Sequence, residues 1–176
     1  MSQPKKRIWT IGHSTRTLEE FVAMLQSFSI TVLADVRHYP GSRKFPQFNK
    51  SELAQSLTRF GIRYEHFECL GGRRKANPDS VHTGWRHPAF RGYADYMQTD
   101  SFLHSIERLC NLAASERIAC MCSEAVWWRC HRSMIADYLH IKGWNVLHIM
   151  SISKVAEHSF RVPAREVEGK LVYSVS

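Results

Sequence analysis

Short apolar segments alternate with amphipathic segments along most of the chain. Segments 7–12 and 31–36 are nearly continuously apolar, as buried strands are, whereas 62–67 alternates between apolar and polar residues. Together with two later apolar segments they predict five strands, at residues 7–12, 31–36, 62–67, 117–121 and 144–149.

Helical patterns separate these strands. Thr17 and Glu20 form a capping box, which predicts a helix from about Leu18 to Phe28. Three further helices are predicted, at residues 49–60, 93–114 (interrupted near Asp100) and 126–142. Two segments rich in glycine and proline predict loops, at residues 37–48 and 70–92.

Strands that alternate with helices predict a parallel sheet covered on both faces. The expected fold is therefore α/β, a three-layer sandwich on a mostly parallel, Rossmann-like sheet of about five strands. With 176 residues the chain is long enough for one core, so residues 1–150 are expected to form a single domain. Residues 151–176 form a tail of uncertain structure, in which EVEGKLVYS is compatible with a small hairpin.

Polar residues follow three of the predicted strands directly. They are His13 and Ser14 after the first strand, Asp35 and Arg37 after the second, and Cys122 and Glu124 after the fourth. The carboxyl ends of parallel strands share one edge of a sheet, where open α/β folds bind ligands. If the strand order is 3-2-1-4-5, the first and fourth strands are neighbours and these side chains converge on one cleft.

The stretch CMCSEAVWWRCHRS, residues 120–133, concentrates reactive side chains. Cys120 lies inside the strand and is expected to be a core thiol. Cys122 lies at the strand end, where a helix N-terminus and nearby arginines favour a thiolate, although a packed thiol fits equally well. His131 fits either a core strut or a cleft residue, and Arg132 either an anion ligand or a surface salt bridge.

A zinc site is a weaker interpretation of the same stretch. Cys122, Cys130 and His131, with His13 or Glu124, would supply four ligands. The chain has no C-x-x-C pair, and neighbouring residues on a helix point about 100° apart. We therefore predict no metal ligand and no cofactor.

Positive charge is concentrated in the middle of the chain. The net charge is +8, and residues 37–91 hold eleven Lys and Arg against four Asp and Glu. Such a segment favours phosphates, nucleotides or nucleic acid, with Arg73, Arg74 and Lys75 as the predicted anion ligands, and its alternative is a solvated basic face with no dedicated ligand. Trp85, Phe90 and Tyr93 either stack on a base or anchor the loop to the core.

The chain has five cysteines, an odd number, and its N-terminus lacks the apolar region of a signal peptide. Reduced thiols and a cytoplasmic location are therefore expected. No apolar run is long enough to span a bilayer, so no membrane association is predicted. The sequence indicates no particular oligomeric state.

Several segments together resemble one family, the domain of unknown function 488 (DUF488). The resemblance runs from Ile8 to about Ile149 and is carried by TIGHSTRTLEEF, DVRHYPGSRKFPQF, LGGRRKANPDS, TGWRHPAFRGYADYM and CSEAVWWRCHRSMIADYL. It implies an α/β sandwich and no established activity. It also implies that nine residues occupy the family's motif positions: His13, Ser14, Asp35, Arg37, Cys122, Glu124, Cys130, His131 and Arg132.

The sequence favours an enzyme that acts on a phosphate-bearing substrate, a nucleotide or nucleic acid. Cys122 would be the nucleophile or an acid–base thiol, and Glu124 or His13 would carry a proton. The remaining candidates bind substrate: Ser14, Asp35, Arg37, Arg73, Arg74, Lys75, His131 and Arg132. One alternative is a binding module for nucleotides or nucleic acid without catalysis, and another is a zinc-stabilised structural domain.

Overall fold

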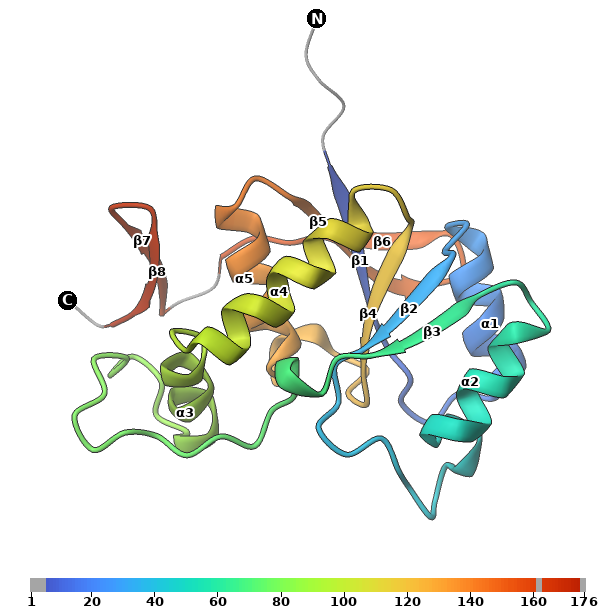
Figure 1. Ribbon diagram of the computed structural model, residues 1–176, viewed down its shortest axis with the longest axis horizontal. Coiled ribbons are helices and arrows are strands. Elements are labelled where there is room, and N and C mark those ends of the chain that lie inside the picture. Colours follow the sequence, from blue (N-terminus) through green and yellow to red (C-terminus); the bar gives the residue numbers. More distant parts are fainter. Residues whose placement is uncertain (1–5, 161–162, 175–176) are drawn as a thin grey trace, which may run out of the picture.

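A six-stranded sheet forms the centre of the molecule, a computed structural model that describes residues 6–160 and 163–174 (Figure 1). Five strands run parallel, and the sixth adds antiparallel at one edge, so the predicted α/β fold is confirmed with one strand more than expected. In chain order the strands are β1 (Arg7–Gly12), β2 (Val32–Asp35), β3 (Arg63–His66), β4 (Ile118–Cys122), β5 (Asn145–Ser151) and β6 (Lys154–Glu157).

The strand order is β3-β2-β4-β1-β5-β6, which differs from the order 3-2-1-4-5 considered from the sequence. Strand β4 lies between β1 and β2, so its carboxyl end has a neighbour on each side. Gly12 pairs with Cys122, and Asp35 pairs with Met121. The first and fourth strands are neighbours as expected, and the second strand now borders the fourth as well.

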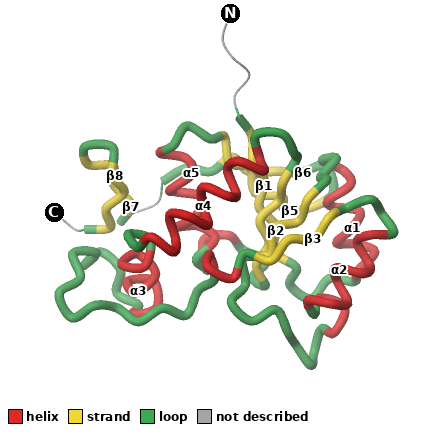
Figure 2. Tube along the Cα trace, viewed as in Figure 1, coloured by secondary structure: helices red, strands yellow, loops and turns green. Residues whose placement is uncertain are grey.

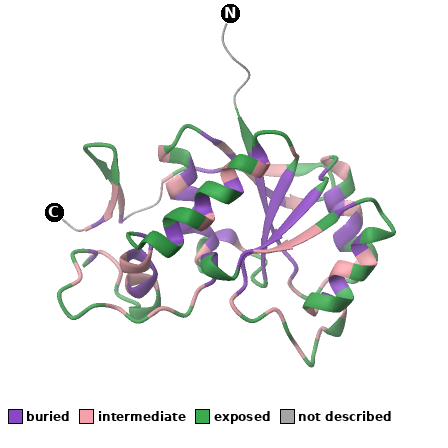
Figure 3. Cartoon of the chain, in the orientation of Figure 1, coloured by how far each residue is buried: buried purple, intermediate pink, exposed green. Residues whose placement is uncertain are grey.

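Helices cover both faces of the sheet, which confirms the three layers (Figure 2). Helices α1 (Leu18–Ser27) and α2 (Lys50–Thr58) pack on one face against Trp9, Ile11, Leu33, Ala119 and Met121. Helices α3 (Pro88–Tyr96), α4 (Asp100–Ala113) and α5 (Arg132–Ile141) pack on the other face against Ile8, Val32, Ala34, Ile118 and Cys120. The two sets alternate along each strand, and the central strands are buried along most of their length (Figure 3).

Local sequence signals set most of the helix ends. The Thr17 hydroxyl accepts a hydrogen bond from the Glu20 amide, as the capping box predicts. Thr99 caps α4 in the same way, which explains the expected interruption near Asp100. Asn49 precedes α2, but its side chain accepts from the Ser42 amide across the 37–48 loop instead of capping the helix.

The predicted helix from residue 126 begins six residues later than expected. Residues Trp127–Arg129 form a short 3-10 turn (η3), Cys130 is extended (φ −139°, ψ 171°), and α5 begins at Arg132. The buried Trp127 ring stacks on His148 at a centroid distance of 4.3 Å. Cys130 and His131 therefore precede the helix. The packing of Trp127 on His148 is the tertiary contact that competes with the local helical pattern.

The tail forms a hairpin of β7 (Ala164–Val167) and β8 (Lys170–Tyr173), as EVEGKLVYS suggested. Its turn places Glu168 and Gly169 at positive φ, the pattern of a two-residue hairpin turn. The hairpin is joined to the main body through Tyr173, which is buried and donates to Asp137 on α5. Residues 161–162 and 175–176 of this tail, and residues 1–5 of the predicted domain, lie outside the described residues.

Two further 3-10 segments of the same length, η1 (Pro46–Phe48) and η2 (Glu68–Leu70), lie in the loops after β2 and β3. Within the part of the chain that the structure describes, we find no helix of sufficient length and apolar character to cross a lipid bilayer.

Candidate functional site: a cysteine cleft at the carboxyl edge of the sheet

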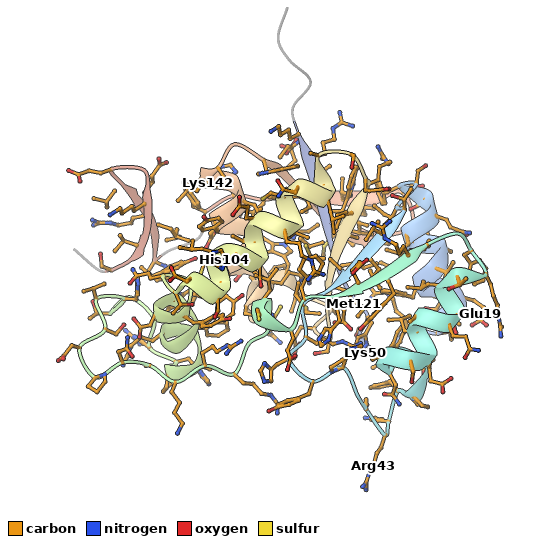
Figure 4. The ribbon with its side chains drawn as sticks, in the orientation of Figure 1. Glu19, Arg43, Lys50, His104, Met121 and Lys142 are labelled. Carbon is orange, nitrogen blue, oxygen red and sulfur yellow. The ribbon has the colours of Figure 1, made fainter. Side chains whose placement is uncertain are left out.

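A cleft of about 740 Å³ opens where β1, β2 and β4 end. Four segments surround it: the end of β1, the loop after β2, the glycine-rich segment after η2, and the end of β4 together with the loop that leads from it into α5. The 37–48 loop extends far from the sheet, and Arg43 projects into solvent from its tip (Figure 4). Lining residues from widely separated segments therefore meet at one sheet edge, as the sequence predicts.

The structure brings seven of the eleven predicted site residues to this cleft: His13, Ser14, Arg37, Arg73, Cys122, Glu124 and His131. Asp35 and Arg132 are buried beneath it, at 0% and 1% exposure. Arg74 and Lys75 do not line it. Arg129, His38 and Tyr39 also line the cleft, inside the two segments that the sequence singles out, and none of the three was among the predicted site residues.

Backbone pairing fixes the position of the β1 end against β4. The His13 amide donates to the Cys122 carbonyl at 3.0 Å, and the Ser14 amide donates to the Ser123 carbonyl at 2.9 Å. Ser14 has a positive φ of 50°, which turns the chain sharply away from the sheet. At Gly12, a Cβ atom would lie only 1.7 Å from the Glu124 carbonyl oxygen, so this close approach requires glycine.

Cys122 and Cys130 form a thiol pair in the wall of the cleft. Their sulfur atoms are 3.0 Å apart, and both residues are buried, at 2% and 9% exposure. The Arg132 amide at the start of α5 points at the Cys130 sulfur from 3.4 Å. At this separation the two thiols share a hydrogen bond, which favours one thiolate and one thiol.

Of the two sulfur atoms, Cys122 is the one whose ionised form its surroundings favour. Burial alone raises the pKa of Cys122, but the hydrogen bond from Cys130 and the positive charge of Arg132 outweigh it and lower that pKa to about 7. Cys130 retains the shared proton, because its hydrogen bond to Cys122 and its burial raise its pKa well above the ordinary value. The structure therefore supports the thiolate interpretation of Cys122 over the packed thiol.

Cys120 behaves as the core thiol that the sequence predicts. It is fully buried in the cluster beneath α4 and α5, and burial raises its pKa to about 12. Cys69 and Cys110 are free and do not line the cleft, so they serve as internal controls for thiol chemistry.

Arg132 is neither a surface salt bridge nor a cleft ligand, which corrects both interpretations of the sequence. One of its terminal nitrogens donates to the Glu124 and Ala125 carbonyls at 3.2 and 3.4 Å, and the other donates to the Thr10 hydroxyl at 3.3 Å. Its Nε has no hydrogen-bond partner and no carboxylate pairs with the guanidinium, within the ranges 6–160 and 163–174. The positive charge of Arg132 lowers the pKa of Cys122, so a thiolate at Cys122 balances this buried guanidinium.

A buried polar chain continues from Arg132 into the interior. Because Thr10 accepts from Arg132, its hydroxyl proton is free to donate to His148 Nδ1. His148 Nε2 then lies 2.9 Å from His158, and His158 lies 2.7 Å from Asp137, which also accepts from Tyr173. Burial keeps His148 neutral by lowering its pKa to about 2. This hydrogen-bonded chain was not predicted, because its residues are scattered along the sequence and form no motif.

Asp35 and Arg37 form a buried pair on the opposite side of the sheet edge. Asp35 accepts from Arg37 Nε at 2.9 Å and from a terminal guanidinium nitrogen at 2.7 Å, and it also accepts from the Tyr64 hydroxyl. The other terminal nitrogen of Arg37 faces His13 Nε2 at 3.4 Å, on the cleft side. Asp35 therefore positions Arg37 and does not itself line the cleft, where the sequence predicted it as an anion ligand.

His13 is held by its backbone and by a ring contact. Its Nδ1 lies 2.9 Å from the Ser14 carbonyl, so this nitrogen carries the proton, and its ring stacks on Phe48 at 4.4 Å. Burial lowers the pKa of His13, so the ring is neutral near pH 7. No hydrogen bond joins the His13 ring to the sulfur of Cys122 among the described residues.

His131 combines both predicted roles. Its Nε2 lies 2.8 Å from the Val36 carbonyl and donates to it, which ties the start of α5 to the end of β2. The ring also lines the cleft beside Gly72. Burial lowers the pKa of His131 to about 4, so it is neutral at physiological pH.

Only part of the basic segment faces the cleft. Arg73 lines it, whereas Arg74 lies over the Tyr96 ring at 3.7 Å and donates to the Gly71 carbonyl, and Lys75 is exposed elsewhere. The aromatic residues nearby anchor the loop: Trp85 stacks on Phe90, and both pack against the core. Base stacking by these rings has no support in this arrangement.

The zinc interpretation also lacks support in the geometry. Across the residues that the structure places, no group of three or more His, Cys, Asp and Glu side chains is arranged to hold a metal ion. Both ring nitrogens of His13 and the Nε2 atom of His131 are engaged in backbone and arginine contacts.

Comparison with known proteins gives one match. The family model described as "Domain of unknown function DUF488" matches residues 17–139, about 70% of the chain. The matched segment contains Asp35, Arg37, the glycine-rich segment and the whole Cys122–Arg132 loop, and it begins after His13 and Ser14. Neither the curated proteins nor the solved structures contain a match.

Proposed function

Because this chain belongs to the DUF488 family, whose description names no activity, we propose a function from its cleft: a thiol-dependent enzyme for a phosphate-bearing substrate. The observation that carries this proposal is the Cys122–Cys130 pair, in which Cys122 is held as a thiolate beside a basic cleft. A thiolate is the nucleophilic form of cysteine, and a pKa near 7 makes it abundant at neutral pH.

The charge of the cleft supports an anionic ligand. Arg37, Arg73 and Arg129 contribute three guanidinium groups to the lining, whereas Glu124 contributes the one carboxylate. Arg37 is already paired with Asp35, whereas Arg73 and Arg129 form no ion pair within residues 6–160 and 163–174. Guanidinium groups bind phosphate oxygens through paired hydrogen bonds, which favours phosphate over other anions.

The loop after β4 adds backbone donors. The N–H groups of Glu124 and Ala125 have no acceptor among the residues that the structure describes. Successive free amides beside a nucleophile bind the oxygens of a tetrahedral or phosphoryl centre. Arg132 holds this loop in place through the Glu124 and Ala125 carbonyls, so the loop is positioned before a ligand binds.

In the proposed reaction the Cys122 thiolate attacks the electrophilic centre of the substrate. A bond forms between sulfur and phosphorus, the bond to the leaving oxygen breaks, and water later releases the phosphoryl group and restores the thiolate. Glu124 is the exposed carboxyl group in the lining and is the candidate proton donor, with neutral His13 as the candidate base. A nucleotide or nucleic acid fits the basic lining, and the five free cysteines fit a reducing cytoplasm.

One observation favours a second function, binding without catalysis. The Cys122 sulfur lies 3.6 Å from the Glu124 carbonyl, a contact to which a protonated thiol would donate, and it is 2% exposed. In that case the thiol serves the packing of the loop, and the guanidinium groups alone bind the ligand.

Protection of Cys122 from alkylation tests the proposal. We expect inorganic phosphate and nucleoside monophosphates to slow the alkylation of Cys122 by iodoacetamide, because a bound phosphate would cover its sulfur. Cys69 is exposed and does not line the cleft, so its alkylation rate should stay unchanged in the same sample. Mass spectrometry of the digested protein reports both rates.

Turnover separates the two functions. An activated aryl phosphate should release its phenol in a reaction that Cys122→Ser abolishes and Cys69→Ser leaves intact. Phosphate protection without turnover, and with equal binding by Cys122→Ser, would favour the binding module. The absence of protection by any phosphate compound would remove phosphate from the proposal.

A further inference from the structure

We propose that Cys122 and Cys130 are a peroxide-sensitive modification site that closes into a disulfide and thereby switches the cleft off. The oxidant is hydrogen peroxide or an organic hydroperoxide, and the bridge is the modified product. The switching consequence rests on the proposed function, whereas the bridge itself rests only on the geometry of the two thiols.

The two sulfur atoms are already adjacent. Their separation of 3.0 Å exceeds the length of a disulfide bond, which is about 2.0 Å, by only about 1 Å. Cys130 lies in an extended residue between η3 and α5, outside any helix or strand. A small movement of its backbone is therefore possible without breaking a helix, while Cys122 stays fixed at the end of β4.

The protonation of the pair assigns the two roles. Cys122 is the thiolate, which is the form that attacks peroxide, and Cys130 keeps its proton until the second step. Both residues line the cleft, so a molecule as small as hydrogen peroxide reaches them from solvent. Arg132 stabilises the attacking thiolate from below, and its amide points at the resolving sulfur.

The chemistry proceeds in two steps. The Cys122 thiolate attacks the terminal peroxide oxygen, a sulfur–oxygen bond forms, the oxygen–oxygen bond breaks, and hydroxide leaves, or the alkoxide where the oxidant is an organic hydroperoxide. The Cys130 thiol then loses its proton and attacks the Cys122 sulfur, a disulfide forms, the sulfur–oxygen bond breaks, and water leaves. The two cysteines give up two electrons, and peroxide is reduced to water. A dithiol reductant reverses the bridge.

Such a bridge has two consequences for the cleft. It removes the nucleophile of the proposed reaction, and it leaves Arg132 without the thiolate that balances its charge. It also protects Cys122, because a sulfenic acid that meets no thiol oxidises further to the irreversible sulfinic acid.

Peptide mapping of the full-length protein tests the bridge. The reduced protein carries five alkylatable thiols under denaturing conditions, and peroxide treatment should leave three. Trypsin cleaves after Arg117, Arg129 and Arg132, so the bridge should join peptide 118–129 to peptide 130–132. Fragmentation of the linked peptide distinguishes Cys122 from Cys120, and dithiothreitol should restore all five thiols.

Matched variants make the result decisive. Cys130→Ser should accumulate sulfinic acid at Cys122, whereas Cys69→Ser should form the bridge as the wild type does. A bridge to Cys120, or equal Cys122 over-oxidation in the wild type and Cys130→Ser, would overturn the proposal. Detection of the bridge requires no substrate, so the two proposals can fail separately. If the bridge forms but the protein binds no phosphate, only the proposed function is wrong. If the protein turns over a phosphate substrate but forms no bridge, only the proposed switch is wrong.

Discussion

Replacing Asp35 with alanine should lower the free energy of unfolding by about 3–5 kcal/mol, because it leaves the guanidinium of Arg37 buried and unpaired. Asp35 is fully buried and accepts three hydrogen bonds from Arg37, through its backbone amide and its guanidinium, and one from Tyr64. For a chain of this size a loss of 3–5 kcal/mol corresponds to a decrease in Tm of about 6–20 °C. Calorimetry measures the decrease directly.

Glu65 supplies the matched control for this variant. It follows Tyr64 on β3 and forms partly exposed ion pairs with Arg63 and Arg108, at 3.5 and 3.4 Å. Exposed pairs contribute about 0–1 kcal/mol, so Glu65→Ala should shift Tm only slightly. If Asp35→Ala is no more destabilising than Glu65→Ala, the Asp35–Arg37 pair does not anchor this side of the cleft.

Acidification should destabilise the protein steeply below pH 6.5. Burial lowers the pKa of His131 to about 4 and that of His148 to about 2, from an ordinary value of 6.5. Between pH 6.5 and 4 the unfolded chain binds protons at both histidines and the folded chain does not. Stability is therefore present above pH 6.5 and lost as the pH falls, by up to about 1.4 kcal/mol per pH unit for each histidine.

Urea unfolding between pH 7 and 4 measures this slope. His131→Gln keeps a donor for the Val36 carbonyl and removes the titrating ring, so its stability should depend less steeply on pH. His104 is exposed on α4 (Figure 4), and His104→Gln should show the wild-type slope. Equal slopes in His131→Gln and the wild type would show that His131 is not a buried neutral group.

Most elements of the fold could be predicted from the sequence, because each buried strand and each capping signal acts locally. The Thr17 capping box and the apolar strand 7–12 are formed as predicted. Strand order is different: β1, β2 and β4 are all apolar, and nothing in their own composition decides which of them lies in the middle. That choice depends on contacts between segments far apart in the chain.

The site was predictable where it follows strand ends and not where it depends on tertiary contacts. His13, Arg37 and Cys122 were found because parallel strands end at one edge. Cys130 was misplaced on a helix, because the contact of Trp127 with His148 has no local signal. The buried hydrogen-bonded chain that links Arg132 to Asp137 was missed for the same reason, since its members Thr10 and His148 are 138 residues apart in the sequence.

The proposed function depends on Cys122 being a thiolate at neutral pH, stabilised by Cys130 and Arg132. The rate of Cys122 alkylation by iodoacetamide, followed by mass spectrometry from pH 5 to 10, measures this ionisation. The rate should rise with a midpoint near pH 7 and then level off, and Cys130→Ala should move the midpoint upward because the S–H donor is lost. A midpoint in the wild type at or above the free-cysteine value of about 8.5, unchanged in Cys130→Ala, would show that Cys122 is an ordinary thiol.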